Sequence, residues 1–122
     1  MEDNIINTNA EPVELSIDRR SRLLVVKQGN CQIRLTKDQV TALNKLRNGE
    51  MPNDAYITST MPRTRFKLQS NGTISMHNND GVEQNLIVLK KTHRYDDLAR
   101  ITAFMEENRP HIAWSRDFKK RY

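Results

Sequence analysis

The chain of 122 residues contains little of what several common sites and architectures require. Its single cysteine, Cys31, excludes an intramolecular disulfide and a zinc site built from several thiolates. Its four glycines are too few for a loop that cradles phosphates with backbone N–H groups. The longest apolar runs, residues 23–26 and 86–89, are far shorter than the roughly 20 residues of a membrane-spanning helix. We therefore expect a cytoplasmic protein without a membrane segment.

Aromatic side chains are also scarce, at 6% of the sequence. Before residue 109 they are limited to Tyr56, Phe66, Tyr95 and Phe104. The core of one domain must therefore be built mainly from Leu, Ile, Val and Met side chains. A core of this kind predicts either modest stability or completion by a second subunit, so a homodimer is one expectation.

No pattern in the sequence indicates a catalytic or metal site. The three histidines, His77, His93 and His111, are scattered and show no metal-ligand spacing. Cys31 stands at the start of an expected strand, where a small buried side chain is the ordinary interpretation. Asp96 precedes an expected helix, where an acid complements the helix dipole. We therefore expect a protein that is not an enzyme and that uses no cofactor.

The net charge of +5 is distributed unevenly along the chain. Residues 1–18 hold five acidic and no basic residues, whereas residues 19–108 hold fifteen basic and nine acidic ones. Residues 109–122 hold five basic residues and one acidic residue. This asymmetry is typical of proteins that bind nucleic acid or an acidic protein surface, although a basic composition also serves solubility.

Changes in composition divide the chain into three parts. Residues 1–12 are polar and acidic and predict a flexible arm. Residues 13–108 carry the periodic apolar patterns of a single α+β domain. Residues 109–122 form a basic tail with aromatic residues. A short basic cluster also stands within the domain at residues 18–22, where a turn is expected.

The domain reads as two antiparallel β-meanders, each followed by a helix, in the approximate order βββα-ββββα. In the first half, Thr36 and Gln39 have the spacing of a capping box, and Gly49 fits a helix end. In the second half, Asp96 or Thr92 would cap the helix. Alternation of apolar and polar residues predicts strands at 13–17, 23–27, 31–35, 55–60, 65–69, 73–78 and 82–91.

The hairpin around Asn71 and Gly72 allows two registers. A two-residue loop would pair Leu68 with Ser75 and mix apolar with polar side chains. A three-residue loop with Gly72 in the left-handed conformation pairs Leu68 with Ile74, and likewise Phe66 with Met76, and keeps the faces separate. We therefore predict the second register. Its opposite face would display Arg65, Lys67, Gln69, Thr73, Ser75 and His77, with Glu83 and Asn85 alongside.

The order of elements is similar in outline to the meander-plus-helix units of Whirly, PUR-repeat and related single-strand-binding proteins. The local likeness is residues 33–40, where the strand Ile33-Arg34-Leu35 runs directly into a capped helix. No single family is identified from this likeness, and an outline of the fold does not assign a function. As a partner, single-stranded nucleic acid is favoured over double-stranded.

The tail combines aromatic anchors with positive charge. Trp114, Phe118 and Tyr122 recur every four residues, so a helix would place them on one face. Basic residues fill the gaps between them. Two interpretations remain open: the aromatic side chains could stack on bases while the cations hold phosphates, or they could dock on the sheet as a third layer.

These patterns together favour a small non-enzymatic nucleic-acid-binding protein that uses a cationic sheet face and the basic tail. The alternative is a protein-binding regulator or inhibitor of a larger complex, of the kind that phages and mobile elements encode. Such a regulator would bind an acidic protein surface or use the strand at 55–60 as a pairing edge. The candidate nucleic-acid-binding residues are Arg65, Lys67, Lys90, Lys91, Arg94, Trp114, Arg116, Phe118, Lys119, Lys120 and Arg121.

Overall fold

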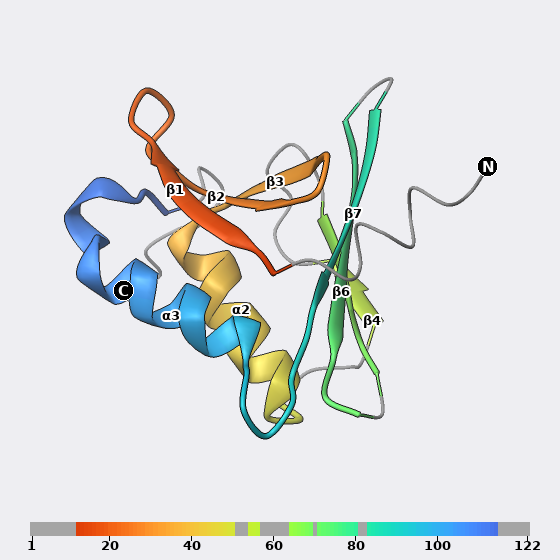
Figure 1. The fold of residues 1–122 in the computed structure, drawn as a ribbon. Coiled ribbons are helices and arrows are strands. Elements are labelled where there is room, and N and C mark those ends of the chain that lie inside the picture. Colours follow the sequence, from red (N-terminus) through yellow and green to blue (C-terminus); the bar gives the residue numbers. More distant parts are fainter. Residues whose placement is uncertain (1–11, 51–53, 57–63, 70, 81–82, 115–122) are drawn as a thin grey trace.

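A computed structural model describes residues 12–50, 54–56, 64–69, 71–80 and 83–114. These residues form two antiparallel sheets and two α-helices, which confirms the predicted α+β class (Figure 1). The finer pattern and the tail match only roughly, because the segment Arg109–His111 is a short 3-10 helix and not the start of an α-helix. None of the helices within the described ranges is long and apolar enough to cross a membrane.

The first sheet is a meander of β1 (Glu14–Asp18), β2 (Leu23–Gln28) and β3 (Cys31–Leu35). The burial pattern alternates along β1, whereas Leu24, Val25 and Val26 of the central strand β2 are all buried. Leu24 pairs with Leu35 and Val26 pairs with Ile33, and all four are buried. The pairing follows from the tight turn at Gly29, whose positive φ of 61° suits a glycine.

The second sheet is a meander of β4 (Asp54–Tyr56), β5 (Thr64–Leu68), β6 (Ile74–Asp80) and β7 (Glu83–Leu89). The predicted register of the central hairpin is confirmed, since Phe66 pairs with Met76 and Leu68 with Ile74. Gly72 has φ +88°, the left-handed conformation expected of it. The backbone N–H of Gln69 donates to the carbonyl of Thr73 at 2.8 Å and closes the loop.

Helix α2 (Lys37–Arg47) follows β3 directly, and helix α3 (Asp97–Glu107) follows β7. At the start of α2, Gln39 Oε1 accepts a hydrogen bond from the N–H of Thr36 at 2.9 Å, as the predicted capping box requires. Asp96, and not Thr92, is the residue that caps α3. The two helices run antiparallel, with Asn44 of α2 hydrogen-bonded to Thr102 of α3.

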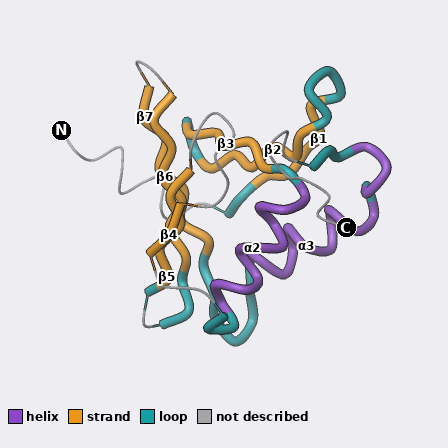
Figure 2. The backbone as a smooth tube through the Cα atoms, turned by 180° about the vertical axis from the view of Figure 1, so that it is seen from behind, coloured by secondary structure: helices purple, strands orange, loops and turns teal. Residues whose placement is uncertain are grey.

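Both helices lie in the angle between the two sheets (Figures 1 and 2). Their apolar stripes and the inner faces of both sheets form one core, which includes Leu35, Leu43, Met76 and Ile101. Phe66 is the only aromatic residue among the buried core residues of the described segments. The core therefore rests on aliphatic side chains, as the scarcity of aromatic residues predicted.

Two buried amide side chains connect the sheets where β3 meets β7. Gln28 accepts a hydrogen bond from the N–H of Val88 at 2.9 Å and donates to the carbonyl of Val88 at 3.0 Å. Asn85 Oδ1 accepts from the N–H of Gln32 at 3.1 Å. The Gln28 side chain therefore satisfies the backbone groups that β7 presents at its edge, in place of a further strand.

Candidate nucleic-acid interface

The side of the second sheet that faces away from the helices carries the predicted cationic face. We call it the outer sheet face, and it consists of two described rows across β5, β6 and β7: Arg65–His77–Leu86 and Lys67–Ser75–Val88. Arg65, Lys67 and His77 are exposed, whereas Leu86 and Val88 are partly buried. The face therefore carries cations on β5 and apolar side chains on β7, with His77 and Ser75 of β6 between them.

The prediction that Asn85 belongs to this face is wrong. Asn85 pairs with Asn78 on the inner side of the sheet and is only 9% exposed. Its side chain instead serves the bond to Gln32 described above. The meander therefore continues with Leu86 and Val88 on the outer side, which makes the outer sheet face more apolar than the sequence suggested.

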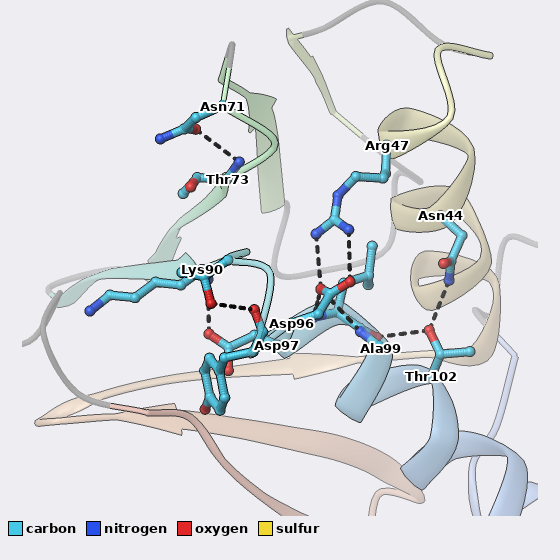
Figure 3. A network of polar contacts seen from close by, with 12 residues as sticks. Asn44, Arg47, Asn71, Thr73, Lys90, Asp96, Asp97, Ala99 and Thr102 are labelled. Atoms are coloured by element: carbon cyan, nitrogen blue, oxygen red, sulfur yellow. Dashed lines mark hydrogen bonds and ion pairs between the residues drawn. The ribbon is translucent and has the colours of Figure 1, made fainter.

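Lys90 follows β7 and continues the side of the strand on which Val88 lies, since side chains alternate along a strand. Its backbone is held by the buried carboxylate of Asp97, which accepts from the N–H of Lys90 at 2.8 Å. The N–H of Asp97 donates back to the Lys90 carbonyl at 3.0 Å. The Lys90 side chain extends away from this carboxylate (Figure 3), so its charge is offered at the surface while its backbone is fixed.

Lys91 lies against the turn between β5 and β6. A Cβ added at Gly72 would stand 3.2 Å from Lys91 Cδ, so the two residues are in close contact. The turn itself is braced by Asn71, whose side chain accepts from the N–H of Thr73 at 3.0 Å (Figure 3). Lys90 therefore extends the cations of the outer sheet face, and Lys91 adds an exposed charge beside the hairpin turn. Arg94 is exposed in the next turn.

The segment that carries these lysines is fixed to helix α2 through Asp96. Arg47 donates from Nη1 to Asp96 Oδ2 at 3.1 Å and from Nη2 to Oδ1 at 3.2 Å (Figure 3). Burial would raise the pKa of Asp96, but the hydrogen bonds and charge of Arg47 and the helix N–H groups outweigh it, so its pKa lies below the ordinary value. Asp96 is therefore ionised at neutral pH.

Trp114 lies elsewhere, beside the start of α2. The N–H of Lys37 donates to the carbonyl of Ala113 at 3.0 Å, and Lys37 Nζ stands 5.5 Å from the centre of the Trp114 ring. Trp114 is 41% exposed. The other tail candidates lie outside the described residues: Arg116, Phe118, Lys119, Lys120 and Arg121.

The sequence did not predict that the basic cluster at residues 18–22 contacts the segment after α3. In the structure, Arg22 Nη2 donates to the carbonyl of Pro110 at 3.1 Å, although the two residues are 88 positions apart. The N–H of Ala113 donates to the carbonyl of Arg22 at 2.8 Å. Local patterns carry no information about such a contact, and the basic character of both segments was the only available signal.

Comparisons of the chain with protein-family models, curated proteins and solved structures give no match. Within the described segments, no group of three or more His, Cys, Asp or Glu residues is arranged to hold a metal ion. A functional assignment therefore rests on the residues of this chain and on their arrangement.

Proposed function

We propose that the protein binds nucleic acid, without catalysis, through the outer sheet face and the adjoining lysines. The observation that supports this most directly is the exposure of Arg65 and Lys67 at alternate positions of β5. Alternate residues of a strand are about 6.6 Å apart and point to the same side. Two cations spaced in this way can contact successive phosphates of an extended strand.

The apolar part of the face favours a single strand over a duplex. Leu86 and Val88 lie in the same rows as Arg65 and Lys67 and are partly exposed. Bases of a single strand expose apolar faces that can pack on such side chains, whereas bases within a duplex are stacked on one another. Phosphates would then contact β5 and the lysines after β7, and bases would contact β7.

Binding of this kind should depend strongly on salt, because each phosphate contact releases condensed counterions. We would measure fluorescence anisotropy of labelled single- and double-stranded DNA and RNA across a salt series. For the double variant Arg65→Gln/Lys67→Gln we expect about tenfold weaker binding and a salt slope reduced by about two. Loss of affinity should be similar for all sequences, because phosphate contacts do not read bases.

The matched control is Lys45→Gln. Lys45 is exposed on helix α2, which packs against the inner side of the sheets, so this variant removes a charge outside the proposed interface. We expect its affinity to change by less than about twofold. An equal loss in Lys45→Gln, or wild-type binding that does not respond to salt, would contradict the proposal.

A protein partner is the second candidate. β4 is the terminal strand of its sheet and pairs, within the described residues, only with β5. A terminal strand offers backbone N–H and C=O groups to which a strand of another protein can pair. A pull-down from extract treated with nuclease separates the candidates: a stoichiometric protein partner that survives the treatment favours this one, and its loss favours nucleic acid.

A further inference from the structure

A second cationic site lies at the end of the molecule opposite the outer sheet face. The turn between β1 and β2 meets the segment after α3 there (Figure 1). A surface pocket of about 260 Å³ lies between them and is lined by Arg19, Arg22, Pro110 and His111. We call it the turn pocket. Three of its four lining residues carry or can carry a positive charge.

Arg22 is held in an unusual backbone conformation. Its φ of 61° is the only positive φ of a non-glycine residue in the described segments. The left-handed region disfavours any side chain with a Cβ, and glycine or asparagine would suit the position better. Its backbone is held there by the bonds to Asp18 (2.7 Å) and Ala113 (2.8 Å). A strained residue of this kind is a frequent feature of functional sites.

The guanidinium groups of Arg19 and Arg22 have no carboxylate partner in the described part of the chain. Two acids of the adjoining segments pair with other arginines, since Asp18 pairs with Arg34 and Glu106 pairs with Arg109. Arg22 uses one N–H group for Pro110, and a guanidinium has five. Both arginines therefore retain donors for an anion.

Further positive charge surrounds the turn pocket. Burial lowers the pKa of Lys37, and the nearby charges of Arg109 and Arg22 lower it further. Mutual repulsion of this kind shows that these cations share one region of the surface. An anion bound beside Arg22 would relieve that repulsion.

We propose that the turn pocket binds a phosphomonoester, the end group of a nucleic-acid strand or of a free mononucleotide. A phosphomonoester carries nearly two negative charges and three acceptor oxygens, which two arginine forks and an imidazole can bind together. A pocket accepts an end group, whereas the flat outer sheet face accepts a continuing backbone. This site goes beyond the proposed function and does not depend on it.

The fluorescence of Trp114 can report binding in the turn pocket. It is the only tryptophan of the chain. It follows Ala113, which is hydrogen-bonded to Arg22, and its ring lies beside Lys37. We would titrate the full chain with an oligonucleotide carrying a 5′-phosphate, with the same oligonucleotide ending in a hydroxyl, and with adenosine monophosphate. Tryptophan fluorescence would report the turn pocket, and anisotropy of an internally labelled strand would report total binding.

We expect Arg19→Gln to weaken the phosphate-dependent fluorescence response about tenfold and to leave binding of the hydroxyl-ended strand unchanged. Arg22→Gly should do the same, and glycine suits its backbone conformation. The matched control is Arg20→Gln. Arg20 belongs to the same turn but does not line the pocket, so its response should change less than about twofold.

Three results would overturn the proposal: an equal response to phosphate and hydroxyl ends, an equal loss in Arg19→Gln and Arg20→Gln, or no response to any phosphomonoester. A response to adenosine monophosphate that matches the response to the phosphorylated strand would assign the site to free nucleotides. A preference for the strand would assign it to strand ends. The two proposals can also be separated. If Arg65→Gln/Lys67→Gln leaves total binding unchanged while Arg19→Gln abolishes the phosphate-dependent fluorescence response, the proposal for the outer sheet face is contradicted and the proposal for the turn pocket is supported.

Discussion

Asp96 offers the sharpest test of how the two helices are held together, because one carboxylate performs two tasks. Its Oδ1 atom accepts from the N–H groups of Leu98 at 3.1 Å and Ala99 at 3.4 Å and so caps helix α3. Both of its oxygens also accept from Arg47 of helix α2. The substitution Asp96→Ala removes the cap and the ion pair together.

The loss of folding free energy expected for Asp96→Ala follows from how exposed the Asp96 and Arg47 side chains are. Loss of a helix cap costs about 1 kcal/mol. The Arg47 side chain is only 14% exposed, and its Nε has no hydrogen-bond partner among the described residues, so Asp96 supplies its main compensation. Stranding this guanidinium should cost about 2 kcal/mol, below the range for fully buried pairs because Asp96 is 29% exposed. The total of about 3 kcal/mol corresponds to a Tm lower by about 10 °C.

Urea unfolding followed by far-ultraviolet circular dichroism would measure the free energies. Asp96→Asn keeps a cap acceptor but loses the charge, so we expect a cost of about 2 kcal/mol. Arg47→Met leaves Asp96 capping the helix and should cost less than about 1 kcal/mol. The double variant Asp96→Ala/Arg47→Met should then be more stable than Asp96→Ala alone. Additive losses would refute this account, because they would mean that Arg47 does not need Asp96.

The same carboxylate predicts a dependence on pH. Its pKa is lowered in the folded protein, against the effect of burial, by Arg47 and the helix N–H groups. A lowered folded pKa means that the stabilisation is fully present above the ordinary value of 3.8 and is lost as the pH falls through the folded pKa. The stability of Asp96→Asn should therefore fall less steeply below pH 3.8 than that of the wild type.

Three further substitutions test the contact between the two sheets and the two turns in which a glycine has positive φ. Gln28→Ala would leave the N–H and C=O of Val88 without the partners that the Gln28 side chain provides. We expect it to lower the free energy of unfolding in urea by about 2 to 3 kcal/mol and to speed hydrogen exchange at the Val88 amide. A loss below about 0.5 kcal/mol would show that water replaces the Gln28 amide. Gly72→Ala and Gly49→Ala should each cost about 1 kcal/mol, because both glycines have positive φ. A Cβ at Gly72 meets only the flexible chain of Lys91 and one at Gly49 meets nothing, so a difference above about 0.5 kcal/mol would contradict this reasoning.

Local patterns predicted those parts of the fold that local chemistry determines. The register of the β5–β6 hairpin followed from keeping Phe66 and Met76 on one face, because a slip by one residue would expose the core side of both strands. The capping box of Thr36 and Gln39 fixed the start of α2 for a similar reason, since it involves residues only three positions apart. Interactions of this range can be read directly from the sequence.

Contacts between distant segments could not be predicted in this way. Asn85 was predicted on the polar face because its side chain is polar. In the structure it is buried, and its side chain accepts a hydrogen bond from the backbone N–H of Gln32. Gln28 directly follows the strand predicted at 23–27, and its role depends on Val88, 60 positions away. In both cases a buried amide is satisfied by the backbone of another element. The partner is set by the packing of the two sheets, which no local pattern specifies.

The arrangement of the two cationic surfaces implies that they act independently. Arg65 and Lys67 belong to the second sheet, whereas Arg19 and Arg22 belong to a turn of the first sheet. The strands of the first sheet separate the turn between β1 and β2 from the second sheet (Figure 2). Substitutions at well-separated sites without shared partners are additive to within a few tenths of a kcal/mol. Phosphate in the turn pocket and a strand on the outer sheet face should therefore bind without affecting each other, unless a single strand is long enough to reach both.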